Sequence, residues 1–334
     1  MTAVFEMEGL QVDLPQEGTL WPQLIGKAPR RLNILSDITL SIAAGESLGL
    51  VGESGSGKTT LARAMLGLLP VSGGVMRFEG HPLGSRDSYA ALRRQTALMF
   101  QDPVASLSPR MRIGALVTEP FIIHREPIGI RRERARSLLE TVGLPATIAE
   151  RFPHELSGGQ ARRVCVARAL ALTPRLVLAD EPTAGLDVSV QGEVLNLMSG
   201  LRDRLHLSFM IISHNLAMVR HVTDRIAIMY LGRMVESGPT AQVFARPRHP
   251  YTASLIAAEP HPDPRRRRTD LAVKGDIPSL LHRPRGCEFH TRCPRATDRC
   301  RAEAPALRAI APGWQVRCHF AEDEPNQPTE GETT

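Results

Sequence analysis

The segment LGLVGESGSGKTTLARAMLGLL, residues 48–69, constrains the fold more than any other stretch of the chain. It reads as a short apolar strand, a glycine-rich turn and an amphipathic helix that begins near Lys58. Within it, Gly52-x-x-x-x-Gly57-Lys58-Thr59 is a complete P-loop. A strand that leads through such a loop into a helix is typical of α/β folds with a parallel sheet, so we expect an α/β architecture.

Each residue type in the loop has a physical role. Glycines let the backbone wrap phosphate oxygens, so that N–H groups point inward and the start of the helix adds its positive dipole. Lys58 would reach the β- and γ-phosphates, and the Thr59 hydroxyl would ligate Mg²⁺. A chance glycine-rich turn is the alternative, and the strand before and helix after disfavour it. The predicted phosphate-binding residues are Gly52, Glu53, Ser54, Gly55, Ser56, Gly57, Lys58, Thr59 and Thr60.

Two further motifs carry charge or exposed backbone. The run LVLADE places Asp180 and Glu181 at the end of a buried strand, where a sheet meets its ligands. Asp180 would hold Mg²⁺, through water, and Glu181 would be the base for an attacking water; a capping pair at a strand end is the alternative. The motif LSGGQ has an N-cap serine and two glycines that expose N–H groups, and it predicts a second anion site at Ser157, Gly158, Gly159 and Gln160.

These motifs, with Gln101 in LMFQDP, Asp187 in AGLD and His214 in FMIISHN, resemble those of ABC transporter ATP-binding subunits over roughly residues 5–240. The resemblance implies a P-loop NTPase cassette within residues 1–245, with a RecA-like core and an antiparallel β subdomain. It also implies a helical subdomain at about residues 105–165 that carries LSGGQ.

The resemblance also implies ATP and Mg²⁺ as cofactors and a reaction shared by two head-to-tail cassettes. LSGGQ of one subunit would cover the γ-phosphate held by the P-loop of the other, and Asp187 would bridge between subunits. Gln101 would contact Mg²⁺ and the attacking water, and His214 the γ-phosphate. The implied catalytic residues are Lys58, Gln101, Glu181 and His214, and the implied Mg²⁺ ligands are Thr59, Gln101 and Asp180.

The adenine-stacking position departs from the family pattern. The family usually places an aromatic residue in the first strands, where this chain has Leu14. Trp21 lies nearby in an irregular segment and is a candidate substitute; the alternative is a packing or exposed tryptophan.

The segment ARPRHPYTASLIAAEPHPDP resembles the linker of oligopeptide and dipeptide importer ATPases, and its prolines are expected to break regular structure. The same family extension would cover residues 246–320, and residues 321–334 are predicted to be disordered. Four of the five cysteines lie in this extension, with spacing C-x5-C-x6-C-x17-C, which differs from zinc knuckles. We expect Cys287, Cys293, Cys300 and Cys318 to hold a [4Fe–4S] cluster, with Zn²⁺ or free thiols as alternatives, and Cys165 to be a packing residue.

A net charge of +6 raises the question of nucleic acid, but the basic residues are scattered arginines, with lysine only at positions 27, 58 and 274. We therefore expect no nucleic-acid role, and a solvated linker at Arg265–Arg268 with an anionic membrane contact as the alternative. No secretory signal or membrane span is apparent.

The resemblance implies an ATPase that energises peptide import from the cytoplasmic side of the membrane. Its partners would be two permease subunits, a second ATPase subunit, with a paralogue favoured over an identical copy, and an extracytoplasmic binding protein. A soluble ABC-type ATPase of DNA repair or translation is the alternative, as is a non-catalytic nucleotide-binding regulator.

Overall fold

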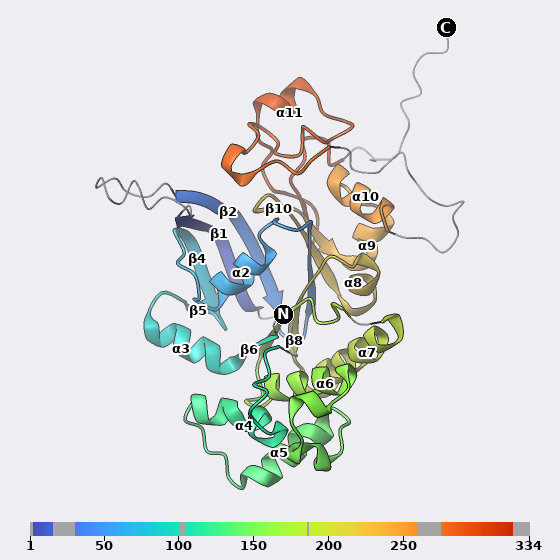
Figure 1. Cartoon of the computed structure of the whole chain (residues 1–334). Helices are drawn as coiled ribbons and strands as arrows, with labels where there is room; N and C mark the ends of the chain where they lie inside the picture. Colours follow the sequence, from blue (N-terminus) through green and yellow to red (C-terminus); the bar gives the residue numbers. More distant parts are fainter. Residues whose placement is uncertain (1–2, 16–30, 100–104, 186, 260–274, 323–334) are drawn as a thin grey trace, which may run out of the picture. The chain divides into compact units, whose positions relative to one another are not determined.

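A computed structural model describes residues 3–15, 31–99, 105–185, 187–259 and 275–322 (Figure 1). The chain divides into two compact units. The signature unit, which carries LSGGQ, comprises Met1–Glu6, Ser41–Ser47 and Arg77–Ser213. The P-loop unit comprises Met7–Leu40, Leu48–Met76 and His214–Thr334.

The P-loop unit contains a sheet in which β3 (Ser47–Val51) pairs in parallel with β9 (Arg225–Tyr230). Antiparallel strands β10 (Arg233–Pro239), β12 (Trp314–Val316) and β11 (Arg308–Ala311) extend this sheet in the order β11-β12-β10-β9-β3. Strands β9 and β10 form an antiparallel hairpin in which Arg233 lies opposite Tyr230. Most of β1 (Ala3–Pro15) and β2 (Arg31–Ala43) and the start of β4 (Gly73–Phe78) also lie here, in the order β2-β1-β4.

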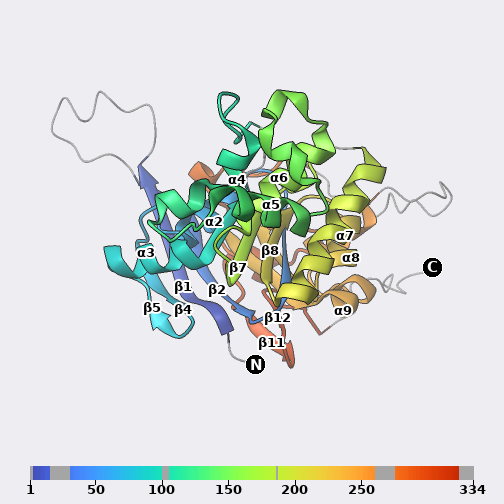
Figure 2. The same cartoon turned by 90° about the horizontal axis from the view of Figure 1, so that it is seen from below.

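The helices of the P-loop unit are short. They are α2 (Lys58–Met65), α8 (Leu216–Val222), α9 (Thr240–Ala245), α10 (Pro250–Ala257), the 3-10 turn η5 (Leu280–His282) and α11 (Asp298–Ala302). Helices α8 and α9 lie beside one another, as Figure 2 shows. The expectation that the prolines of residues 245–264 break regular structure is wrong at α10, because Pro250 occupies the first turn of that helix, where a missing N–H costs nothing.

The signature unit contains three parallel strands, β6 (Thr96–Met99), β7 (Leu176–Asp180) and β8 (Ser208–Ser213), in the order β6-β7-β8. Helices α4 (Ile113–Ile123), α5 (Arg131–Thr141) and α6 (Gly158–Ala169) pack on one another, as Figure 1 shows. The remaining elements are β5 (His81–Pro82), α3 (Arg86–Gln95), η1 (Ala146–Glu150), η2 (Pro153–Glu155) and α7 (Val188–Leu205).

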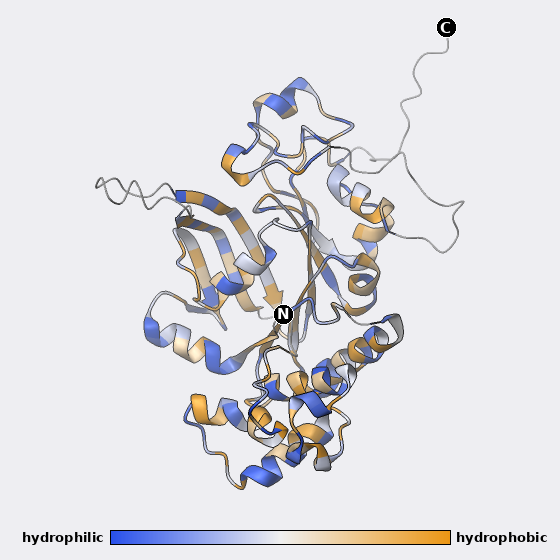
Figure 3. Ribbon diagram, viewed as in Figure 1, coloured by the Kyte–Doolittle hydropathy of each residue, from blue (hydrophilic) through white to orange (hydrophobic). Residues whose placement is uncertain are grey.

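Burial follows the hydrophobic pattern of each element. All five residues of β3 and of β7 are buried, as expected for central parallel strands, whereas β1 alternates buried and more exposed residues. Figure 3 shows the same alternation of polar and apolar residues along the sheet that contains β1 and β2. Cys165 on α6 is buried, which confirms its predicted packing role. None of the described helices combines the length and the apolar character that a membrane crossing needs.

Candidate nucleotide site and its surroundings

The P-loop follows β3 and leads directly into α2, as predicted. Gly57 forms the N-cap of α2 with φ 101°, a left-handed conformation that glycine adopts without strain. Gly52 lies against the end of β9, since a Cβ there would be 2.3 Å from the Met229 carbonyl oxygen. The loop is also tied to the turn after β9, where the Gly232 N–H donates to the Ser56 carbonyl at 2.9 Å. Together these contacts fix a turn of narrow geometry whose tip, Ser54 and Gly55, is exposed.

The side chain of Lys58 lies folded over the loop. Its Nζ donates to the carbonyls of Gly52 at 2.8 Å and Glu53 at 2.9 Å, and the residue is only 8% exposed. These contacts concentrate a positive charge at the loop, which suits an anionic ligand. Thr59 and Thr60 follow on α2 and are partly exposed.

The two predicted carboxylates end β7 in the signature unit. Asp180 is 7% exposed at the last strand position. Glu181 follows with φ 49°, a left-handed conformation that costs a non-glycine residue about 1–3 kcal/mol and is concentrated at functional sites. Its N–H donates to the Ile212 carbonyl on β8 at 2.9 Å, so the sheet holds this turn in place. The strand was predictable from its apolar run, and the backbone strain at Glu181 was not.

The LSGGQ motif forms the N-terminus of α6. The Ser157 Oγ accepts from the Gln160 N–H at 3.2 Å, and the Ser157 N–H donates to Gln160 Oε1 at 3.1 Å, which is a reciprocal capping box. Ser157 and Gly158 are exposed, and a Cβ at Gly158 would meet no atom within 4 Å. Packing within this unit therefore does not require glycine at 158.

One arginine of this helix, unassigned from the sequence, holds the segment after Glu181. Arg162 on α6 is 7% exposed, and its guanidinium donates to the carbonyls of Pro182 and Ala184. Asp187 then caps α7, accepting from the Val190 N–H at 3.0 Å. Arg162 therefore ties the LSGGQ helix to the backbone that follows Glu181. The only sequence signal was an arginine two residues after LSGGQ.

Of the remaining residues predicted to contact the nucleotide, some lie in the part of the chain that the structure describes and others lie outside it. His214 follows β8 and is exposed at the start of the P-loop unit's third segment, next to Asn215, which caps α8. Gln101 and Trp21 lie outside the described residues, as does the run Arg265–Arg268. Leu14 lies near the end of β1 and is partly exposed.

The four predicted cysteine ligands line one small cavity in the P-loop unit. Its volume is about 20 Å³, and His249 and Phe289 also contribute to its wall. Burial raises the pKa of the Cys287 thiol to about 12, that of Cys293 to about 11, and that of Cys318, and neighbouring thiols add to the effect. Within the described part of the chain, however, no three or more His, Cys, Asp or Glu side chains are already arranged around a metal position. The thiols converge on one cavity without forming a finished ligand set.

Glu236 on β10 anchors the surroundings of this cavity. The carboxylate is fully buried and accepts from the Arg248 and His249 N–H groups, both at 2.9 Å, and from Trp314 Nε1 at 3.0 Å. Burial raises the pKa of Glu236 and lowers that of His249 to about 3, so His249 is the neutral acceptor that its bond from the Tyr251 N–H requires. The sequence signal was a glutamate directly after the apolar pair Met234-Val235 of β10.

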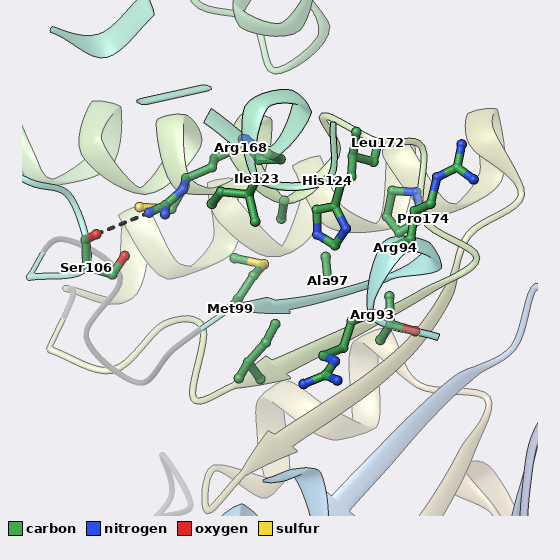
Figure 4. A pocket seen from close by; sticks show the side chains of 15 residues that line it. Arg93, Arg94, Ala97, Met99, Ser106, Ile123, His124, Arg168, Leu172 and Pro174 are labelled. Atoms are coloured by element: carbon green, nitrogen blue, oxygen red, sulfur yellow. Dashed lines mark hydrogen bonds between the residues drawn. The ribbon is translucent and has the colours of Figure 1, made fainter. Parts of the chain in front are cut away.

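A larger pocket, the basic pocket, lies in the signature unit between α3, β6, α4 and α6. It has a volume of about 180 Å³ (Figure 4). Arg168 donates to the Ser106 carbonyl at 3.1 Å and pairs with Glu119 at 2.7 Å. Figure 4 shows Ile123 above Met99 and His124 above Ala97, both of which lie on β6. The lining combines an apolar floor with the side chains of Arg93, Arg94 and Arg168, of which Arg94 pairs with Glu126 and Arg168 with Glu119.

Comparisons with known proteins agree with these features. Residues 35–184 match the family described as ABC transporter, and residues 235–300 match the family described as oligopeptide/dipeptide transporter, C-terminal region. A di/tripeptide transport ATP-binding protein of Pseudomonas aeruginosa is 43% identical over 89% of this chain and 92% of the relative. A putative peptide import ATP-binding protein of Brucella ovis is 46% identical over 86% of this chain and 92% of the relative.

Solved structures show the same fold. A subunit of a cbiONQ transporter complex from Clostridium perfringens is 27% identical with a TM-score of 0.64, over 73% of this chain and 92% of that one. A dimeric ATP-binding cassette, bound to ADP and Pi after hydrolysis, is 25% identical with a TM-score of 0.60, over 71% of this chain and 98% of that one. The predicted cassette fold is therefore confirmed.

Proposed function

Since the chain belongs to the ATP-binding subunits of ABC transporters, as an ATPase of the group that carries the oligopeptide/dipeptide transporter C-terminal region, we propose that it hydrolyses ATP to drive import of peptides or similar small solutes. The observation that carries the proposal is the identity of 43–46% with peptide transport ATP-binding proteins across 86–89% of the chain. None of these comparisons supports a soluble ATPase of DNA repair or translation.

The residues of the P-loop would bind the nucleotide. N–H groups of Gly52 to Thr60 would surround the phosphates, and Lys58 would exchange its loop carbonyls for phosphate oxygens. Mg²⁺ would be held by the Thr59 hydroxyl, Gln101 and Asp180, the last through water. The ion would neutralise charge on the phosphates.

Hydrolysis would depend on three side chains. Glu181 would take a proton from the attacking water, and its strained backbone fixes the direction of its side chain. His214 would donate to the γ-phosphate, and Gln101 would orient the water. Catalysis here is largely positioning and charge stabilisation, so small displacements of these groups would be costly.

A second ATP-binding subunit would complete the site. The open space at Gly158 and the exposed capped start of α6 suit the γ-phosphate of a nucleotide bound by the partner. Asp187 would contact the partner close by. ATP would then join two subunits, of which the second is a paralogue rather than an identical copy, and hydrolysis would separate them.

The basic pocket supports association with the two membrane permeases. Its apolar floor and arginine side chains suit an amphipathic cytoplasmic helix with acidic residues. This docking would place the chain peripherally on the cytoplasmic side of the membrane, where an extracytoplasmic binding protein delivers substrate to the permeases.

We further propose that residues 1–245 form the nucleotide-binding domain and residues 246–320 a C-terminal segment organised by Cys287, Cys293, Cys300 and Cys318. Convergence of four thiols on one cavity fits a thiolate-bound [4Fe–4S] cluster, with Zn²⁺ as the alternative. Burial raises the pKa of Cys287, Cys293 and Cys318, and a bound metal would lower these pKa values. The metal would also stabilise a segment with little core of its own.

Reconstitution would test the import function. The chain, its permeases and a second ATPase subunit are placed in lipid vesicles with a peptide-loaded binding protein outside, and ATP hydrolysis and peptide uptake are measured. We expect peptide to stimulate hydrolysis and hydrolysis to drive uptake, and Glu181→Gln to abolish both. Hydrolysis indifferent to the permeases and peptide but stimulated by DNA or ribosomes would overturn the proposal.

A further inference from the structure

Glu53, the residue after the first glycine of the P-loop, is held by an arginine from far along the chain. Arg292 Nη1 lies 2.7 Å from Glu53 Oε2, and Arg292 Nη2 lies 2.9 Å from Glu53 Oε1. The Arg292 side chain is 5% exposed and that of Glu53 is 22% exposed. This two-point geometry is the strong form of the arginine–carboxylate pair, and it is shielded from water.

The backbone of Glu53 is held from the same direction. Its N–H donates to the Tyr251 hydroxyl at 2.9 Å, and Tyr251 on α10 is fully buried. Tyr251 packs against the rings of Tyr230 and Phe289, with ring centroids 4.8 and 5.3 Å away. The guanidinium of Arg292 lies 5.8 Å above the Tyr230 ring. Side chain and backbone of Glu53 therefore rest on one packed aromatic and cationic cluster.

The third polar group of Glu53 reaches the essential lysine. Its carbonyl accepts from Lys58 Nζ at 2.9 Å. Residues beyond position 250 thus hold two polar groups of Glu53, and the carbonyl accepts from Lys58 Nζ and from the Ser56 N–H, the latter at 3.1 Å. Arg292 and Tyr251 therefore hold a residue whose carbonyl is one of the acceptors of Lys58.

The charge of Glu53 matters as much as its position. A carboxylate within a phosphate-binding loop repels a polyanionic ligand, and in a partly buried site this repulsion is poorly screened. Arg292 neutralises that carboxylate and directs both oxygens to itself. The pair therefore leaves Lys58 and the loop N–H groups as the charges that a nucleotide encounters.

We propose that Arg292 is a positioning residue of the ATP site, which neutralises Glu53 and, with Tyr251, fixes the P-loop in its nucleotide-binding form. The C-terminal segment is then a working part of the nucleotide site. Phe289, which packs on Tyr251, also lines the cavity of the four cysteines, and Arg292 directly precedes Cys293. Disorder in the cysteine cavity would consequently weaken ATP binding.

The test measures the dissociation constant of a fluorescent ATP analogue with Mg²⁺ on the full-length chain, and KM and kcat for ATP in the assembled transporter. Arg292→Gln should raise the dissociation constant and KM about 10-fold with kcat within about twofold, because it leaves an unpaired anion beside the ligand. Arg292→Lys should recover part of the loss. Glu53→Gln keeps the backbone N–H of the loop and removes the repelling charge, so it should bind ATP more tightly than the wild type.

The double variant Glu53→Gln/Arg292→Gln separates charge from simple support and keeps the test valid if Arg292→Gln folds poorly. It should recover affinity to within about threefold of the wild type, since the repelling carboxylate is gone. The matched control is Arg299→Gln on α11 of the same segment, which breaks an exposed pair between Arg299 and Glu303. This control should leave ATP affinity unchanged.

A purely structural role predicts a different pattern. Arg292→Gln and Glu53→Gln would then weaken binding alike, or lower only the melting temperature, and the double variant would be no better than Arg292→Gln. Either result overturns the proposal. Failure of peptide to stimulate hydrolysis by the wild-type transporter would count against the import function and not against this inference. This inference is also refuted if Arg292→Gln binds ATP as tightly as the wild type.

Discussion

Replacing Glu236 on β10 should lower the free energy of unfolding of the P-loop unit more than replacing an exposed residue would. The carboxylate is fully buried and is the acceptor for the N–H groups of Arg248 and His249 and for Trp314 Nε1. Glu236→Leu leaves these three donors without that acceptor. A buried unsatisfied donor costs about 1–3 kcal/mol, so the lost free energy of unfolding is about 3–9 kcal/mol before any relief from removing a buried charge.

Removing the buried carboxylate also removes its desolvation cost, and we expect this gain to be smaller than the cost of the three unpaired donors. Burial raises the pKa of Glu236, which shows that the site disfavours the ionised form despite its donors. Glu236→Leu removes this desolvation cost while leaving neutral N–H donors unpaired, so we expect a net loss at the low end of that range, about 3–5 kcal/mol. Glu236→Gln keeps one acceptor oxygen and places an amide N–H₂ against the second donor set, so we expect a loss of about 1–3 kcal/mol.

The assay uses the tryptophan that contacts this carboxylate. The chain has two tryptophans, so Trp21→Phe leaves Trp314 as the reporter of denaturant unfolding. The control Glu322→Gln breaks an exposed pair with Arg308 and should change stability by less than about 1 kcal/mol. Glu236→Leu within 1 kcal/mol of the wild type would refute the argument that these three donors depend on one buried acceptor.

The pH dependence gives an independent sign. Because the folded-state pKa of Glu236 is raised above its usual value, its contribution is present at low pH and is lost as pH rises through the folded pKa. The wild type should therefore lose stability relative to Glu236→Gln as pH rises from about 4.5, by up to about 1.4 kcal/mol per pH unit. Denaturation of both proteins across this pH range measures it, and an opposite slope would contradict the assigned cause.

Three other predictions concern the site. Glu181→Gln should bind ATP normally, lower hydrolysis about 10²–10⁴-fold and trap a closed pair of subunits, measured by turnover and size-exclusion chromatography; wild-type turnover would show that Glu181 is not the base. Arg93→Glu/Arg94→Glu should weaken permease association in pull-down experiments while leaving ATP affinity unchanged, and unaltered association would contradict the assigned docking site. Cys300→Ser should remove metal from anaerobically purified protein, checked by visible spectrum and by iron, sulfide and zinc content; protein that lacks metal before substitution would refute the cluster and zinc assignments.

Elements with strong local signals were predictable. The P-loop, the buried strand before Asp180 and the cap at Ser157 each follow from spacing and propensity, and the structure has all three where they were expected. The start of α10 was missed because proline was treated as a breaker, although Pro250 at a first helical turn favours a helix. The signal was present in HPYT, where His249 provides the cap.

Contacts between distant residues were not predictable. Nothing near Arg292 indicates that its partner is Glu53, 239 positions earlier. The partners of Arg162 are backbone carbonyls, which carry no sequence signal. Such contacts depend on tertiary geometry, which single-sequence periodicity does not encode.

Polar contacts join the C-terminal segment to β2, beside the buried apolar side chains of Phe289, Trp314 and Val316, and they bear on why its state should reach the P-loop. Arg317 pairs with Asp37 on β2 at 2.8 Å, and Arg283 donates to the Asn33 carbonyl at 3.0 Å on the same strand. Contacts of this kind are directional, so a shift of the segment breaks them instead of being absorbed by sliding apolar surfaces. Disorder around the cysteines should therefore change ATP affinity before it unfolds the sheet. ATP titrations of Cys300→Ser at temperatures below its unfolding transition test this: affinity equal to that of the wild type would contradict it.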